Sequence, residues 1–168
     1  NSTIQDKYDL GVQLRSFKFR HDKQQDTSAQ DCINRNRLDH HRIFVASLYK
    51  QHQTFFKETY GHADTLSSFE LQSNKVEQFQ FALAEMFILS QSRTLLVSPY
   101  STFGYTAIAL RPDHDDGGHG VYMLDQRVSC RQLSTLDREP CFHKAPRSTG
   151  FCADGTPVWP DRDRLTRP

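Results

Sequence analysis

Two short stretches of this chain carry residue types suited to holding a phosphate or a diphosphate. In the first, GVQLRSF, Arg15 offers a guanidinium that can hold a diphosphate through two parallel hydrogen bonds. Gln13 shares the parity of Arg15 along an extended chain and is expected to point to the same face. Both residues are therefore candidate ligands of an anion.

The second stretch, STFGY, follows a short apolar run that ends at a proline. It combines a candidate helix N-cap, two further hydroxyl groups and a glycine that lets a ligand approach the backbone, in Ser101, Thr102, Phe103, Gly104 and Tyr105. The first N–H groups of a helix have no intrahelical partner, so phosphate oxygens would suit this turn.

Each stretch also has a simpler explanation. Ser101 can cap a helix without touching any ligand, because serine and threonine are common at helix starts. Arg15 can be a strand residue that faces water, since Lys18 and Arg20 continue the same polar alternation. The residues alone leave both alternatives open.

Further titratable residues give weaker signals. Glu85 stands among apolar neighbours, where a buried carboxylate needs a partner such as a ribose hydroxyl or Arg15, although an exposed helix position is equally compatible. His143 lies between Cys141 and Pro146 and could titrate near neutral pH, although a loop histidine held by neighbouring disulfides is the simpler explanation. A loose set of potential metal ligands is interrupted by two glycines and favours a solvated loop, so we expect no metal site: His114, Asp115, Asp116 and His119.

The elements that would position these residues alternate between strand and helix. Strand-like runs are Leu10–Phe19, Arg42–Leu48, Thr94–Ser98 and Val121–Leu124, with a weaker strand or loop at Leu66–Leu71. Helix-like runs are Ser28–Arg37, Lys50–Tyr60 ending at Gly61, Val76–Arg93 and Ser101–Leu110. This alternation predicts an α/β fold, with a Rossmann-like parallel sheet covered by helices on both faces.

The run Val76–Arg93 has the clearest helical period. Its apolar residues recur at steps of three and four and form one stripe, which we expect to pack on the sheet: Val76, Phe79, Leu83, Met86 and Phe87. Periodicity stops near Asp125. We therefore divide the chain into a Rossmann-like domain, residues 1–124, and a cysteine- and proline-containing extension, residues 125–168, that packs on it.

Composition narrows the functional classes. The 168 residues carry a formal net charge of +1, so no chain-wide field would draw nucleic acid or a membrane surface, and we expect no nucleic-acid partner. No apolar run is long enough to cross a bilayer. Because the chain begins at Asn1 without an initiator Met, we expect it to be part of a longer precursor with a membrane anchor upstream.

The cysteines and one sequon favour a lumenal setting. Cys32, Cys130, Cys141 and Cys152 include no C-x-x-C pair, so disulfides are the expected use, and the spacing leaves all three pairings open. Asn1-Ser2-Thr3 matches the N-glycosylation pattern, which makes Asn1 a candidate glycosylation site.

Three blocks of the chain resemble the plant cell-wall α-1,2-fucosyltransferases that act on xyloglucan and arabinogalactan. They are GVQLRSF at residues 11–17, ALAEMFILSQSRTLLVSPYSTFGYTA at residues 82–107, and a tail with Cys130, EPCFH at residues 139–143 and Cys152. The blocks have the order and spacing of that family, and the middle block is specific to it. The stretch RPDHDDGGHG and the tail that ends at Pro168 depart from the family pattern.

This resemblance implies a function. It implies transfer of fucose from GDP-fucose, with inversion at the sugar carbon and no metal or other cofactor, by a two-Rossmann-domain (GT-B) enzyme held in the Golgi by an N-terminal anchor. The chain would be its C-terminal, donor-binding half with a disulfide-rich tail, incomplete without an N-terminal acceptor domain. Arg15 would face the diphosphate and stabilise the leaving GDP, and residues 101–105 would surround the nucleotide.

The acceptor implied is a galactose-terminated cell-wall polysaccharide or glycan, and a homodimer is a further expectation. Two other functions remain open from the sequence. One is a non-catalytic carbohydrate or protein interaction module on the same fold, and the other is an inverting glycosyltransferase that uses another nucleotide sugar.

Overall fold

The computed structural model describes residues 8–15, 23–38, 41–66, 75–99, 101–111, 120–125 and 129–133. Within these ranges the chain forms one six-stranded sheet in the order β3-β2-β1-β4-β5-β6, with β1 to β5 parallel and β6 antiparallel to β5. The predicted parallel, Rossmann-like sheet is therefore confirmed.

The strands are short and mostly apolar. Their bounds are Leu10–Leu14 for β1, Ile43–Ser47 for β2, Ala63–Asp64 for β3, Thr94–Val97 for β4, Val121–Asp125 for β5 and Ser129–Gln132 for β6. All residues of β1 and β4 are buried, as in the central strands of a sheet covered on both faces. The predicted first strand was too long, because the described part of the chain leaves strand geometry after Leu14.

In the described part of the chain, four helices connect the strands. They are α1 at Lys23–Arg35, α2 at Lys50–Tyr60, α3 at Lys75–Ser90 and α4 at Thr102–Ala109. The predicted bounds of α2 were correct, and its end is explained by Gly61, whose φ of 66° closes the helix in the left-handed region. None of the described helices has the length and apolar content to span a bilayer.

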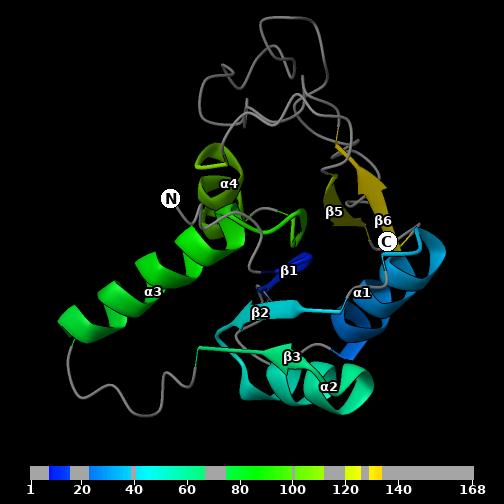
Figure 1. Ribbon diagram of the computed structural model, residues 1–168, viewed down its shortest axis with the longest axis horizontal. Coiled ribbons are helices and arrows are strands. Elements are labelled where there is room, and N and C mark those ends of the chain that lie inside the picture. Colours follow the sequence, from blue (N-terminus) through cyan, green and yellow to red (C-terminus); the bar gives the residue numbers. More distant parts are fainter. Residues whose placement is uncertain are drawn as a thin grey trace, which may run out of the picture.

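The helices cover both faces of the sheet (Figure 1), which gives the domain two cores. On one face, α1 and α2 pack through Ala29, Ile33 and Phe56 against Val12 and Val45. On the other face, Leu89 of α3 and Ala107 and Ile108 of α4 pack against Leu95 and Val97. The alternation along β1 therefore sends Gln13 to the side of α3 and α4, away from Val12.

One prediction about α3 was wrong. Four of the five residues in the apolar stripe that was expected to pack on the sheet are exposed, with exposed fractions of 66% at Val76, 63% at Phe79, 46% at Leu83 and 56% at Phe87, and Met86 is half-buried. Leu89 contacts the sheet instead. In Figure 1, α3 extends outward from the sheet and meets it only near its C-terminal end.

Two strands were not predicted. β3, at Ala63–Asp64, lies before the run Leu66–Leu71, for which a weaker strand or a loop was predicted, and residues 67–71 of that run lie outside the described ranges. β6 lies within the predicted extension and adds a strand to the sheet. It brings Cys130 to Cys32 of α1, and the two form a disulfide.

Candidate functional site

The strand order places a topological switch point between β1 and β4. From β1 the chain moves by α1 to β2 on one side, and α3 later returns it to β4 on the other side. Ligands of open α/β sheets bind in the crevice beyond the carboxyl ends of the strands at such a point. Here those ends carry Gln13, Arg15 and Ser98, and α4 begins four residues after Ser98.

Ser98 joins the two strand ends. Its hydroxyl donates to the Gln13 backbone oxygen at 3.2 Å and accepts from the Arg15 backbone N–H at 2.9 Å. Its own N–H points to both the backbone oxygen and the side-chain Oε1 of Gln13, at 3.0 and 3.2 Å. Because Ser98 and Gln13 are buried, these bonds hold the base of the crevice in one arrangement.

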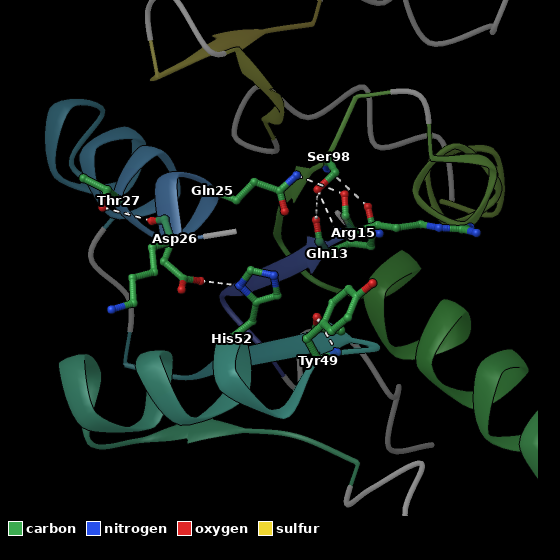
Figure 2. A network of polar contacts seen from close by, with 10 residues as sticks. Gln13, Arg15, Gln25, Asp26, Thr27, Tyr49, His52 and Ser98 are labelled. Atoms are coloured by element: carbon green, nitrogen blue, oxygen red, sulfur yellow. Dashed lines mark hydrogen bonds and ion pairs between the residues drawn. The ribbon is translucent and has the colours of Figure 1, made fainter. Parts of the chain in front are cut away.

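The backbone of Arg15 is held from two sides. Besides the contact with Ser98, its carbonyl oxygen accepts from Nε2 of Gln25, in the first turn of α1, at 3.0 Å. The side chain is exposed and, as Figure 2 shows, extends from the end of β1 toward α3 and α4. The guanidinium is thus available to a ligand, whereas the backbone bonds do not depend on the side chain.

A cavity of about 260 Å³ lies beside Arg15, between the sheet edge, α3 and α4. Three of the predicted site residues line it together with Arg15: Gln13, Glu85 and Phe103. Its other lining residues, none of which the sequence pointed to, are Ala46, Ser47, Leu48, Gln53, Leu66, Gln78, Phe81 and Ala82. Most of the cavity surface is apolar, but six of the twelve lining residues carry polar side chains, a combination that suits a small polar ligand.

Glu85 is the carboxyl group among these lining residues. Burial raises the pKa of this carboxyl to about 7, because desolvation disfavours its charged form. The described residues show no ion pair between Glu85 and Arg15, so the arginine does not compensate for that burial. Within the cavity, Glu85 can therefore accept or donate a hydrogen bond near neutral pH.

The five residues of the STFGY turn divide into different roles. Ser101 is fully buried and is the N-cap of α4, its Oγ accepting from the Gly104 N–H at 3.3 Å. Its hydroxyl is thus engaged within the helix, as the capping alternative predicted. Thr102 is exposed at the first helical position, and Phe103 lines the cavity.

Gly104 and Tyr105 complete the turn. A Cβ at Gly104 would lie 2.8 Å from Gln13 Oε1 and 3.1 Å from Val97 Cβ, so glycine permits α4 to sit closely on the strand ends. The Tyr105 hydroxyl lies 4.0 Å from the Met123 sulfur and does not line the cavity. The structure therefore brings Gln13, Arg15, Glu85 and Phe103 together and gives Ser101 and Gly104 supporting positions.

A buried pair beside the site was not predicted from the sequence. Asp26 of α1 and His52 of α2 are almost fully buried, and Asp26 Oδ1 lies 2.5 Å from His52 Nδ1 (Figure 2). The pair links the first turns of α1 and α2, next to the helix start from which Gln25 holds Arg15. In the sequence both residues occur among polar helix positions, which gives no signal of burial.

Several candidates lie outside the described residues. These are Asn1, Cys141, Cys152, His143 and the group His114, Asp115, Asp116 and His119. Among the side chains that the structure does describe, no cluster of three or more His, Cys, Asp or Glu is arranged to hold a metal ion.

Comparison with known proteins identifies the family. Residues 20–150 match the model of the xyloglucan fucosyltransferases, which is more than half of the chain. This chain belongs to the xyloglucan fucosyltransferase family. The matched range includes the STFGY turn and Glu85 but begins after Arg15.

Two curated relatives from Arabidopsis thaliana support the assignment. The chain is 29% identical over 128 residues to "Putative fucosyltransferase 10", covering 67% of this chain and 24% of that protein. It is 32% identical over 110 residues to "Galactoside 2-alpha-L-fucosyltransferase", covering 61% of this chain and 18% of that protein. The chain thus matches no more than about a quarter of either relative's length.

Solved structures of fucosyltransferases share the fold. A variant of Arabidopsis thaliana FUT1 in complex with GDP matches 93% of this chain and 38% of its own, with a TM-score of 0.63 and 22% identity. The α-1,6-fucosyltransferase NodZ co-crystallised with GDP matches 74% of this chain and 40% of its own, with a TM-score of 0.53 and 17% identity. These matches confirm a Rossmann-like half of the GT-B type.

Proposed function

We propose that this chain is the donor-binding half of a fucosyltransferase that transfers fucose from GDP-fucose to a galactose-terminated polysaccharide or glycan. One observation carries the proposal. In a chain of this family, the Arg15 guanidinium and the start of α4 border one cavity at the switch point of the sheet. A cation and a helix N-terminus are the groups that recognise a diphosphate.

The same arrangement supports a role in the chemical step. As the bond between fucose and GDP breaks, negative charge develops on the β-phosphate, and a fixed guanidinium stabilises that charge. Arg15 would act in this way, since its backbone is bonded on both sides while its side chain remains accessible. This leaving-group assistance needs no metal, and we propose a metal-independent reaction.

We further propose that the reaction inverts the configuration at the sugar carbon. In a single displacement, the acceptor hydroxyl attacks from the side opposite to GDP. This assigns GDP to the cavity beside Arg15 and the acceptor to a second domain, which the relatives' greater length can accommodate. A Golgi-lumenal setting, reached through an upstream membrane anchor, would agree with the disulfide between Cys32 and Cys130.

Nucleotide-dependent thermal protection tests the proposal. GDP at 100 times its dissociation constant adds about 2.7 kcal/mol to the free energy of unfolding. At roughly 2–4 °C per kcal/mol for a chain of this size, the melting temperature should rise by roughly 5–10 °C. The experiment compares GDP, GDP-fucose and UDP, on both the 168-residue chain and the full-length gene product.

We expect GDP and GDP-fucose to protect and UDP to have a much smaller effect. Equal protection by UDP would favour a glycosyltransferase with another nucleotide sugar. No protection of the full-length protein by either guanine nucleotide would overturn the proposal.

A further inference from the structure

The most unusual surface of the described structure is the outer side of α3. Five of the seven large hydrophobic residues that are exposed in the described ranges belong to this helix. Phe81 also lines the cavity, and the other four are Val76, Phe79, Leu83 and Phe87. Monomeric soluble domains rarely expose a contiguous apolar surface of this kind, and large exposed patches mark sites of protein association.

Helical spacing separates two sides of α3. Gln78, Ala82 and Glu85 line the cavity, and they recur with Leu89 at steps of four, three and four residues, which places them on one side. Val76, Phe79, Leu83 and Phe87 recur at steps of three, four and four, and at 3.6 residues per turn their mean direction lies roughly 135° around the helix axis from that of the first set. They therefore form a second stripe, on the side turned away from the cavity. We call these four residues the outer stripe.

We infer that the outer stripe is covered by the second half of the same enzyme, the part that longer family members carry outside the matched region. This inference rests on the proposed function. The matched region is 38% of the FUT1 chain and 40% of the NodZ chain, so more than half of those proteins lies beyond it. Material of that size must contact this domain if the two halves are to enclose one active site.

The position of α3 favours the second half of the enzyme over a second copy of the chain. α3 follows β3 and precedes β4, so its first turns lie at the carboxyl edge of the parallel sheet, the edge that carries the cavity. An acceptor must approach the donor from this edge, so the acceptor-binding half has to lie near it. Contact with the outer stripe would also hold the helix that forms one cavity wall.

The residue types agree with such an interface. Aromatic residues are enriched and charged residues are depleted at the centre of protein interfaces, and the outer stripe consists of two phenylalanines, a leucine and a valine. Gln80 falls between Val76 and Leu83 on the same side of α3, so it is not a control. Thr59 is exposed near the end of α2, a helix on the opposite face of the sheet, which makes it a control position away from the outer stripe.

Cysteine labelling tests the inference. Phe79→Cys, Leu83→Cys and the control Thr59→Cys are made separately in the full-length gene product and in the 168-residue chain, and each reacts with a water-soluble maleimide. All three positions are exposed in the described structure, so the substitutions should not disturb its core. The parent protein measures the background from native cysteines, and labelling in denaturant gives the unprotected rate.

We expect Phe79→Cys and Leu83→Cys to react at least about ten times more slowly than Thr59→Cys in the full-length protein. In the 168-residue chain all three should react at similar rates. If the isolated chain is unstable, the labelling rates in the full-length protein are compared with those of the same variants in denaturant. The ratio of stripe to control rates in that comparison still decides the outcome.

Three results would overturn the inference. Equal rates in the full-length protein would mean that nothing covers the stripe. Protection that disappears on dilution would assign the stripe to a second copy, and protection already present in the dilute isolated chain would assign it to another segment of this chain. Because labelling needs no nucleotide, failure here would leave the donor-site proposal intact, and loss of GDP protection alone would leave the interface intact.

Discussion

At the scale of single residues, a substitution of Arg15 can test ligand binding without disturbing the fold. Its two hydrogen bonds to other parts of the domain are made by backbone atoms, and its side chain is exposed. Arg15→Ala should therefore change the free energy of unfolding by no more than about 0.5 kcal/mol. Loss of a charge-assisted contact of about 1.5–3 kcal/mol should weaken GDP binding on the order of 10- to 100-fold.

Titration calorimetry with GDP and urea unfolding measure the two effects of Arg15→Ala. Arg15→Lys keeps the charge but loses the paired geometry of the guanidinium, so it should recover only part of the affinity. Arg131→Ala removes an exposed arginine from β6, at the far edge of the sheet, and should leave GDP binding unchanged. Unaltered GDP affinity in Arg15→Ala would refute the assignment.

Glu85 predicts a pH dependence of stability. Burial raises its folded-state pKa from 4.5 to about 7, so the folded state binds more protons than the unfolded state between these values. The resulting stability is fully present below pH 4.5 and is lost as the pH rises through about 7. The loss should be on the order of 2 kcal/mol.

Urea unfolding at several pH values between 4.5 and 8 checks the Glu85 contribution. Glu85→Gln should remove this part of the decline, because an amide does not titrate in that range. Glu58→Gln changes an exposed carboxylate on α2 and should leave the decline in place. Identical pH profiles for the parent and Glu85→Gln would show that the carboxyl is better solvated than the structure indicates.

At the scale of elements, substitutions at the start of α4 can show whether the Ser101 hydroxyl caps the helix or binds a ligand. The buried Ser101 hydroxyl accepts from the Gly104 N–H. Ser101→Ala should therefore lower the free energy of unfolding by about 1 kcal/mol, and Ser101→Gly should lower it by only a few tenths of a kcal/mol. If Ser101 is a cap alone, GDP affinity in the two variants, measured below their unfolding transitions, should stay within about twofold of the parent.

The opposite result would support the alternative in which the Ser101 hydroxyl binds a phosphate of the ligand. A loss of GDP affinity above tenfold in Ser101→Ala, without a comparable loss of stability, would mean that the hydroxyl turns to the ligand when it is present. Thr102→Ala is the matched control, because Thr102 is exposed one residue later in the same turn.

Much of the framework could be predicted because its signals are local. The apolar run of β4 and the turn after it indicated a buried strand followed by a helix, and the Gly61 stop located the end of α2. The parity of Gln13 and Arg15 correctly placed both on the side of the cavity. These features depend on a few neighbouring residues, whose periodicity is the same in the sequence and in the fold.

The errors concern contacts between distant segments. The apolar period of α3 revealed a stripe, but a period does not say which surface covers it, and here the sheet contacts Leu89. Ser98 looked like the last residue of a strand, and its role arises only because β1 lies next to β4. Asp26 and His52 are 26 residues apart, so no local pattern could pair them.

At the scale of the whole molecule, the disulfide joins two elements that pack together in the fold but lie far apart in the sequence, α1 and β6. Cys32 is buried in the core under α1, and Cys130 is carried by β6 at the edge of the sheet. The two are 98 residues apart in the chain, so the bond closes a loop that includes most of the strands. A link of this span restricts the unfolded chain strongly.

Replacing both cysteines by alanine should lower the free energy of unfolding by about 2–5 kcal/mol, the usual cost of losing a native disulfide. Urea unfolding measures the change, and the single variant Cys130→Ala separates loss of the bond from loss of the buried Cys32 sulfur. Because the bond joins α1 to β6, away from the residues that line the cavity, GDP affinity should not change while the protein is folded. A stability loss below about 1 kcal/mol would mean that the other contacts of β6 suffice to hold it. A loss of GDP affinity in the folded variant would mean that the position of α1 controls Arg15 through Gln25.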